Sequence, residues 1–191
     1  MLGDARPMDN GCIQLTSDAP FKEGLAYSET KLDLEQFFEI SYDIYLGNKD
    51  EGADGMTFIV HNDSREYMSY GSWGECMGYG QFNPQNPGVF PSIAIEFDTY
   101  QNPIQNDPAS DHVAFHDDGN SWHSEHWNNN DPQFNLEDDY LHDFTFRWQP
   151  DINRVTFFLD GEVVYEATVD LINDIFDGSN MVIWGFAAST G

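Results

Sequence analysis

Two acidic side chains, Glu96 and Asp98, lie two residues apart in an alternating segment that runs from Ser92 to Tyr100. In a β-strand alternate side chains share a face. The strand would present Ile93, Ile95, Phe97 and Thr99 on one face, and Ala94, Glu96, Asp98 and Tyr100 on the other. Two carboxylates on one face repel each other, and burying them unpaired would cost several kcal/mol each. Their spacing therefore indicates a bound cation.

Three further residues of ligand type follow, Asn102, Asp107 and His112, in a loop that we expect to fold back over the strand end. Asp98, Asn102 and Asp107, with a backbone carbonyl, form an all-oxygen set that suits Ca²⁺ at about 2.3–2.6 Å. Glu96, Asp98 and Asp107 with His112 include an imidazole, which suits Mn²⁺ or another transition metal. Asp98 and Asp107 each have two oxygens and could bridge both ions.

Two other interpretations of these residues stay open. Glu96 and Asp98 could lie on a solvated sheet face, because short E-x-D patterns are common. The complete spacing E-x-D-x-Y-x-N-x4-D-x4-H is far more restrictive. Paired carboxylates also serve retaining glycoside hydrolases, in which the nucleophile and the acid lie about 5–5.5 Å apart. Retaining β-glucanases have an E-x-D-x-x-E pattern on one strand, in which one Glu is the nucleophile and the other the general acid. Here Gln101 stands at the position of the acid, and its amide cannot donate a catalytic proton. We therefore expect no enzyme.

The segments that would position these residues have the pattern of β-strands and turns. Period-2 alternation between clusters of Gly, Pro, Asn and Asp predicts one all-β antiparallel sandwich domain over residues 1–191. The expected strands are residues 37–46, 56–60, 92–100, 143–148, 155–159, 162–167 and 181–187. Asp160-Gly161 predicts a hairpin turn, and residues 169–176 predict a turn or two of helix. Residues 63–91 and 103–132 are expected to be long loops.

The charge balance excludes two classes of partner. There are 34 acidic against 7 basic residues, for a net charge of −27, and such a surface repels nucleic acid and anionic lipid. No apolar run is long enough for membrane insertion. Residues 1–10 lack the apolar core of a signal peptide, so we expect none there.

Cys12 and Cys76 are compatible with one disulfide, two free thiols, or a partner outside this chain.

The metal segment resembles the metal-binding region of the legume-type (L-type) lectins. Other segments extend the resemblance over about residues 3–191: Gly52 to Ile59 is similar to the loop with the family's sugar-binding aspartate, Trp184 to Gly191 to its late G-F-S-A-x-T-G strand, and Cys12 to Thr16 to an early strand of secreted bacterial members. The resemblance implies a concanavalin A-like jelly roll, a glycan or polysaccharide partner and an extracellular or cell-surface location. A homo-oligomer is compatible with it.

The resemblance also implies a role for each matching residue. Glu96, Asp98, Asp107 and His112 would bind the transition metal, and Asp98, the Tyr100 carbonyl, Asn102 and Asp107 would bind Ca²⁺. Sugar hydroxyls would contact Asp54, the Asn102 amide and the backbone N–H of Gly74, with Gly71 as the alternative glycine, and the Tyr100 ring would stack on the sugar. The Ala53–Asp54 bond would be cis. The chain would then be a lectin or, as a further alternative, a calcium-stabilised adhesin domain without sugar binding.

Some features lie outside this pattern. The family's fourth specificity loop and a closing strand would follow Gly191, so we expect the chain to be truncated at its C-terminus, and the monosaccharide is not readable. Trp73 is equally suited to stacking on a ligand and to packing on the sheet. His116, His123 and His126 flank an acidic, Asn-rich stretch and are expected in a solvated loop, since no third metal ligand stands at a set spacing.

Overall fold

The computed structural model describes residues 1–82, 84–109, 111–123 and 134–191, and strands dominate it. The strands are β1 (Leu2–Gly3), β2 (Arg6–Pro7), β3 (Ile13–Gln14), β4 (Lys22–Tyr27), β5 (Leu32–Asp33), β6 (Phe38–Ile44), β7 (Gly55–His61), β8 (Ser92–Asp98), β9 (His112–Asp117), β10 (His142–Gln149), β11 (Arg154–Leu159), β12 (Glu162–Thr168) and β13 (Met181–Thr190). The short helices are η1 (Glu66–Met68), η2 (Gly74–Cys76), η3 (Pro103–Gln105), η4 (Pro150–Ile152) and η5 (Leu171–Ile175). None of the helices in the described ranges has the length and apolar character needed to span a bilayer.

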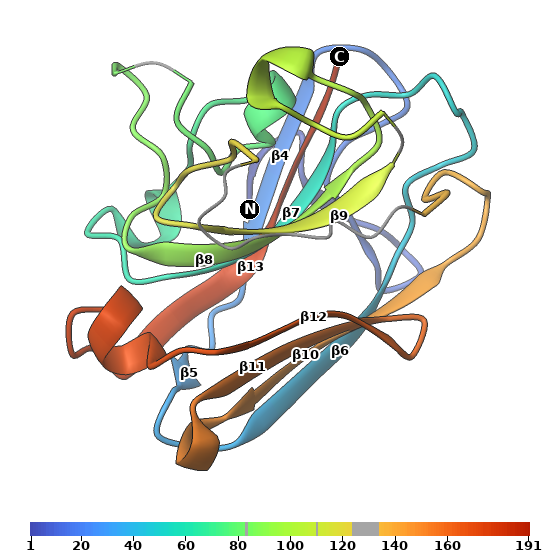
Figure 1. The fold of residues 1–191 in the computed structure, drawn as a ribbon. Coiled ribbons are helices and arrows are strands. Elements are labelled where there is room, and N and C mark those ends of the chain that lie inside the picture. The colour runs from blue at the N-terminus through green and yellow to red at the C-terminus, as the bar shows by residue number, and fades with distance from the viewer. Residues whose placement is uncertain (83, 110, 124–133) are drawn as a thin grey trace.

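Two antiparallel sheets pack face to face (Figure 1). The larger sheet has the order β1-β4-β13-β7-β8-β9, with β5 also pairing with β13, and the smaller has the order β12-β11-β10-β6. A separate two-stranded ribbon joins β2 and β3. This arrangement confirms the predicted jelly-roll sandwich. The predicted hairpin turn is also confirmed, because Asp160 and Gly161 join β11 to β12 with positive φ angles.

The core between the sheets is rich in aromatic side chains. Phe58 from the larger sheet and Phe144, Phe146 and Phe157 from the smaller are fully buried. The Phe146 and Phe157 rings stack with centroids 4.9 Å apart, and Trp148 donates its indole N–H to the Leu34 carbonyl at 2.8 Å. Buried aromatic rings contribute large apolar areas, so the sandwich gives the loops above it a rigid base.

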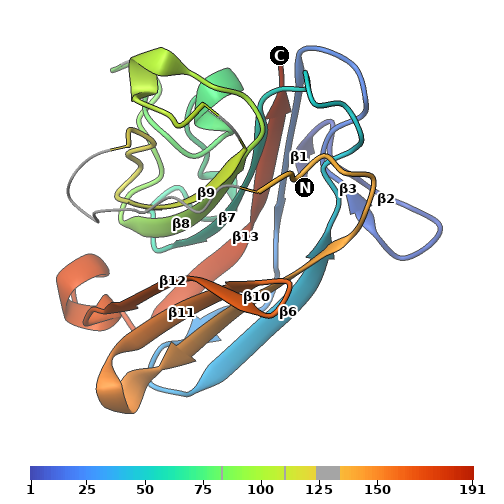
Figure 2. The same ribbon diagram turned by 45° about the vertical axis from the view of Figure 1, so that its right-hand side comes forward.

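The two faces of β8 have different surroundings, as the alternation predicted. Ile93, Ile95 and Phe97 belong to the core between the sheets. Glu96 and Asp98 point to the opposite face of the larger sheet, yet they are 0% and 1% exposed. The interpretation of this face as solvated is therefore wrong. The β7–β8 and β8–β9 connections, green to yellow in Figures 1 and 2, lie over this outer face.

One prediction about local structure needs correction. Residues 103–132 were expected to be one long loop containing His112, but His112 begins strand β9, which pairs with β8. Apolar alternation in Val113 and Phe115 forms this strand, because both side chains reach the core. The cysteines are both free thiols, with Cys12 exposed and Cys76 buried. The helix expected at residues 169–176 is present as η5.

Candidate metal centre and the loops above it

Strand register places the predicted metal ligands side by side. Gly55 of β7 pairs with Asp98 of β8, and Asp98 pairs in turn with His112 of β9. Asp54, the predicted sugar-binding aspartate, directly precedes Gly55. A Cβ at Gly55 would lie 2.2 Å from the Phe97 carbonyl oxygen, so only glycine allows this approach. One row across three strands therefore joins the aspartate loop to the metal ligands.

The oxygen donors predicted for Ca²⁺ converge beyond the end of β8. Asp98 Oδ1 accepts a hydrogen bond from the Tyr100 N–H at 2.7 Å, and Asp107 Oδ2 accepts one from the Asn102 N–H at 2.7 Å. These bonds orient each carboxylate. The remaining oxygens, Asp98 Oδ2, Asn102 Oδ1 and Asp107 Oδ1, are buried and have no hydrogen-bond partner in the described part of the chain. Buried polar atoms are normally satisfied, so the donor set fits a hard cation with oxygen ligands.

The acid groups of this cluster resist ionisation without a cation. Burial, then the charges of Glu96 and Asp107, raises the pKa of Asp98 well above its usual range. Burial also raises the pKa of Asp107, although the Asn102 N–H and nearby histidines oppose that shift. Both shifts follow from packing carboxylates together away from water. Divalent ions would offset this charge, and the residues present fit the two-metal arrangement that the sequence predicted.

The cluster contains more histidines than the sequence analysis predicted. Glu96, His112 and His123 form one group able to hold a metal, and Asp98, Asp107 and His112 form another. His116 Nε2 hydrogen-bonds Glu96 Oε2. The expectation that His116 and His123 lie in a solvated loop is therefore wrong, since their side chains are 4% and 5% exposed.

The sequence contained a signal for only one of these two residues. His116 belongs to β9 and follows His112 by four residues, so period-2 alternation puts both on the outer face of the sheet. His123 lies beyond the strand, and no periodicity indicates its position. His126 lies outside the described residues.

The loop that begins with Asp54 is held by its neighbours on both sides. The Ala53–Asp54 peptide bond is cis, as the resemblance implied. Asp54 N–H donates to the Ser189 carbonyl at 3.0 Å, and Asp54 carbonyl accepts from the Thr99 N–H at 3.1 Å. Asp54 Oδ2 is buried and has no hydrogen-bond partner among the described residues. Burial raises the pKa of Asp54, the nearby Ser189 side chain opposes that shift, and the charge of Glu75 raises the pKa further.

Gly74 lies close to Asp54 through a shared contact. The Ser189 hydroxyl donates to the Gly74 carbonyl at 2.7 Å, while the Ser189 carbonyl accepts from Asp54. A Cβ at Gly74 would meet no atom within 4 Å, so the residue faces open space. The alternative glycine, Gly71, already donates its N–H to the Gly78 carbonyl at 2.6 Å. The geometry therefore favours Gly74 as a backbone donor to a ligand.

The aromatic candidates separate by exposure. The Tyr100 side chain is 50% exposed beside the metal cluster, so its ring can receive a ligand. Trp73 is half-buried and stacks on Tyr70 with ring centroids 5.7 Å apart. It also packs against a separate cluster of buried apolar side chains, formed by Leu25, Ile59, Tyr79, Val89, Ala94 and Ala187. Of its two expected roles, packing is the one that the structure shows.

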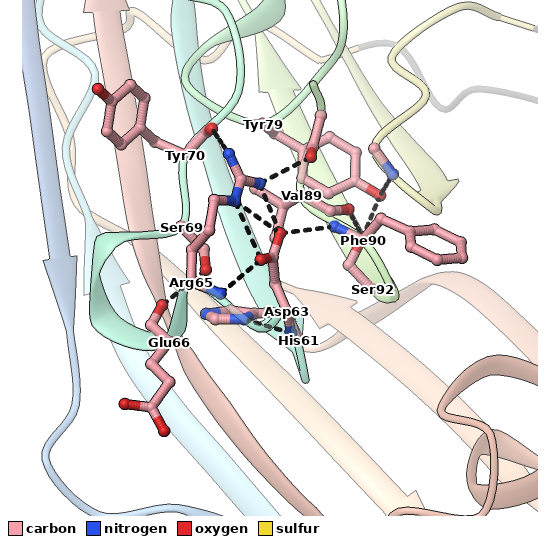
Figure 3. A network of polar contacts seen from close by, with 12 residues as sticks. His61, Asp63, Arg65, Glu66, Ser69, Tyr70, Tyr79, Val89, Phe90 and Ser92 are labelled. Carbon is pink, nitrogen blue, oxygen red and sulfur yellow. Dashed lines mark hydrogen bonds and ion pairs between the residues drawn. The ribbon is translucent and has the colours of Figure 1, made fainter. Parts of the chain in front are cut away.

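A half-buried ion pair holds the base of the β7–β8 connection (Figure 3). Asp63 accepts hydrogen bonds from Arg65 Nη2 at 2.5 Å and from the Phe90 N–H at 3.1 Å. Arg65 also donates to the carbonyls of Tyr70 at 2.9 Å and Gly88 at 2.8 Å. The pair thus joins both ends of the segment that contains Gly74, and sequence analysis did not single it out.

Fold and site together define a β-sandwich with a buried acidic and histidine cluster under an open loop. The model of the legume lectin beta-barrel domain matches residues 1–191. The chain belongs to this family. Lectins bind carbohydrates without converting them, which agrees with the prediction that the chain is not an enzyme. Legume lectins bind Ca²⁺ and a transition metal, and the clusters described above are of the type that such ions require.

Solved legume lectins share the fold at low sequence identity. Peanut lectin with a 9mer peptide is 21% identical with a TM-score of 0.73, over 98% of this chain and 81% of that chain. Basic winged bean lectin with Tn-antigen is 20% identical with a TM-score of 0.77, over 99% and 81%. Winged bean acidic lectin complexed with methyl-α-D-galactose is 22% identical with a TM-score of 0.76, over 100% and 83%.

Proposed function

We propose that this domain binds a glycan in a manner that depends on Ca²⁺ and a transition metal. Asp98, Asn102 and Asp107, with the Tyr100 carbonyl, would hold Ca²⁺. Glu96, Asp98, Asp107 and His112 would hold the transition metal. The bound ions supply positive charge that keeps buried carboxylates ionised and fixes the loops that contain them.

One observation carries this proposal. Buried oxygens of Asp54, Asp98, Asn102 and Asp107 lack hydrogen-bond partners in the described ranges. Strand register pairs Asp98 with the neighbour of Asp54, Asp107 lies beside Asp98 in one group able to hold a metal, and the Asn102 N–H donates to Asp107. Leaving such groups unsatisfied costs about 1–3 kcal/mol each. Cations for the last three and a hydroxyl-bearing ligand for Asp54 would remove that penalty.

Each proposed sugar contact follows from donor and acceptor chemistry. A sugar hydroxyl both donates and accepts, so the Asp54 carboxylate can accept from one hydroxyl. The Asn102 side-chain amide and the Gly74 N–H can donate to others. With Asn102 Oδ1 on Ca²⁺, its Nδ2 is the atom left for the ligand. The exposed Tyr100 ring can cover an apolar C–H face of the sugar.

The proposed partner and location follow from the same chemistry. A net charge of −27 is compatible with neutral polyhydroxyl ligands and disfavours nucleic acid and anionic membranes. The two winged bean lectins were solved with Tn-antigen and with methyl-α-D-galactose, both carbohydrate ligands. We place the domain outside the cell or on its surface, where glycans and calcium coexist.

A glycan array in Ca²⁺ and Mn²⁺ tests this function with a matched pair of variants. Asp54→Asn removes the charge and replaces one of the two acceptor oxygens by a donor NH2 group without changing side-chain size, and Asp151→Asn makes the same change on an exposed residue of η4. We expect wild type and Asp151→Asn to bind the same glycans and Asp54→Asn to bind none. Equal binding by Asp54→Asn would contradict the proposed site.

Two results on wild-type protein would overturn the function itself. Calcium-dependent thermal stabilisation with no array signal would indicate a structural adhesin domain. Release of reducing sugar from β-glucans would indicate a hydrolase.

A further inference from the structure

His123 reaches the metal cluster from the segment that follows β9. Its side chain is 5% exposed. His123 Nε2 lies 3.1 Å from His112 Nε2 and 3.3 Å from Asp107 Oδ1. The same nitrogen lies 3.8 Å from Glu96 Oε2. Donor atoms from four separate positions in the chain therefore converge on one small volume.

These separations are those of neighbouring ligands on one ion. Donors bound at about 2.0–2.1 Å, at angles between octahedral and tetrahedral, lie about 2.9–3.4 Å apart. The His112–His123 and Asp107–His123 distances both fall in that range. Without an ion, a proton shared between the two imidazole nitrogens can satisfy them. A divalent cation would take the place of that proton.

His116 supports this arrangement through the same oxygen of Glu96. His116 Nε2 hydrogen-bonds Glu96 Oε2, and the His116 and His123 rings are perpendicular with centroids 5.4 Å apart. Groups that hydrogen-bond a metal ligand fix its orientation. Glu96 Oε2 thus contacts one imidazole that orients it and lies near another that can share its ion.

We propose that His123 is a direct ligand of the second metal, beside Glu96, Asp98, Asp107 and His112, and that this extra imidazole makes the site select Zn²⁺, Co²⁺ or Ni²⁺ over Mn²⁺. This inference rests on the proposed function for the existence of the metal centre. Imidazole favours zinc, nickel and copper, whereas carboxylate and water ligands favour manganese. An imidazole in place of a carboxylate or water ligand therefore shifts the preference of the site among divalent metal ions.

Competition titrations of metal-stripped protein test the selectivity, with Ca²⁺ held constant and Zn²⁺ and Mn²⁺ compared. His123→Gln removes the proposed ligand. His142→Gln makes the same change on β10, where His142 hydrogen-bonds Asp160. We expect His123→Gln to lose at least about tenfold in Zn²⁺ affinity and to change little for Mn²⁺, with His142→Gln like wild type. Unchanged Zn²⁺ affinity, or equal losses for both metals, would overturn the proposal.

X-ray absorption at the zinc edge gives a second readout, independent of ligand binding. We expect two imidazoles on zinc in wild type and one in His123→Gln. A single imidazole in wild type overturns the role of His123. Glycan binding by the same wild-type sample separates the two proposals: binding with a single imidazole leaves the lectin function intact, whereas two imidazoles without glycan binding support the metal site and contradict the lectin function.

Discussion

Asp98 and His112 are direct cross-strand partners on β8 and β9, with His112 Nε2 3.9 Å from Asp98 Oδ2. On its other side Asp98 pairs with Gly55, the neighbour of Asp54. Asp98, a proposed metal ligand, is therefore paired with the residue next to Asp54, the proposed sugar acceptor. This contact explains mechanically how ions buried in the sheet could set the geometry of an open loop.

Replacing Asp98 by Asn should have opposite effects with and without calcium. At calcium one hundred times its Kd, wild type gains about 2.7 kcal/mol, or about 5–10 °C in Tm for a domain of this size, and Asp98→Asn should lose that gain. In chelator the variant should melt at or above wild type, because an Asp beside Glu96 must either bind a proton or bear a buried charge when no cation is present, and Asn does neither. Thermal melts in both conditions, with Asp151→Asn as control, check this. A variant that melts well below wild type in chelator would contradict it.

Replacing Tyr100 by Ala should weaken glycan binding about tenfold and leave the fold intact. The ring is 50% exposed, and the aromatic contact contributes about 1 kcal/mol beyond the area it covers. Tyr100→Phe should keep the affinity, since the ring and not the hydroxyl is proposed to contact the sugar. Tyr140→Ala, at a side chain that is 71% exposed, is the control. Calorimetric titration measures all three, and full affinity in Tyr100→Ala would refute the stacking role.

Ser189 should contribute to binding without contacting the glycan. Its hydroxyl donates to the Gly74 carbonyl and its carbonyl accepts from Asp54. Ser189→Ala loses one hydrogen bond of about 1 kcal/mol, so we expect about fivefold weaker binding while calcium affinity stays the same. Ser179→Ala is a control outside the cluster. A parallel loss of calcium affinity in Ser189→Ala would show that the residue supports the metal centre instead.

The Asp63–Arg65 pair should give a pH-dependent part of the stability. Burial alone would raise the pKa of Asp63, but hydrogen bonds from Arg65 and from the Arg65 and Phe90 N–H groups lower it to about 2. A lowered pKa gives stability that is fully present above the unfolded value of about 4 and is lost as pH falls toward 2. In chelator, Asp63→Asn should be about 2 kcal/mol less stable than wild type at pH 7, with the gap closing below pH 4. A gap that is constant between pH 7 and pH 2 would contradict this.

Sequence predicted the sandwich and the shared face of Glu96 and Asp98 because both depend on short periodicities. Alternation in β8 placed Glu96 and Asp98 on one face, and the structure confirms that face. His112 was expected in a loop, since a polar stretch around β9 masked a strand of only six residues. His123 contacts Glu96 and Asp107, and the Asp63–Arg65 pair contacts Gly88 and Phe90. These contacts join residues distant in the sequence, which local spacing does not encode.

Titration of one array-identified glycan into the same protein sample tests the central claim most directly. The sample is measured with Ca²⁺ and the second metal bound, again after chelation, and again after both ions are restored. We predict binding, complete loss and full recovery. Undiminished affinity in the stripped protein would show that the ions do not shape the carbohydrate site.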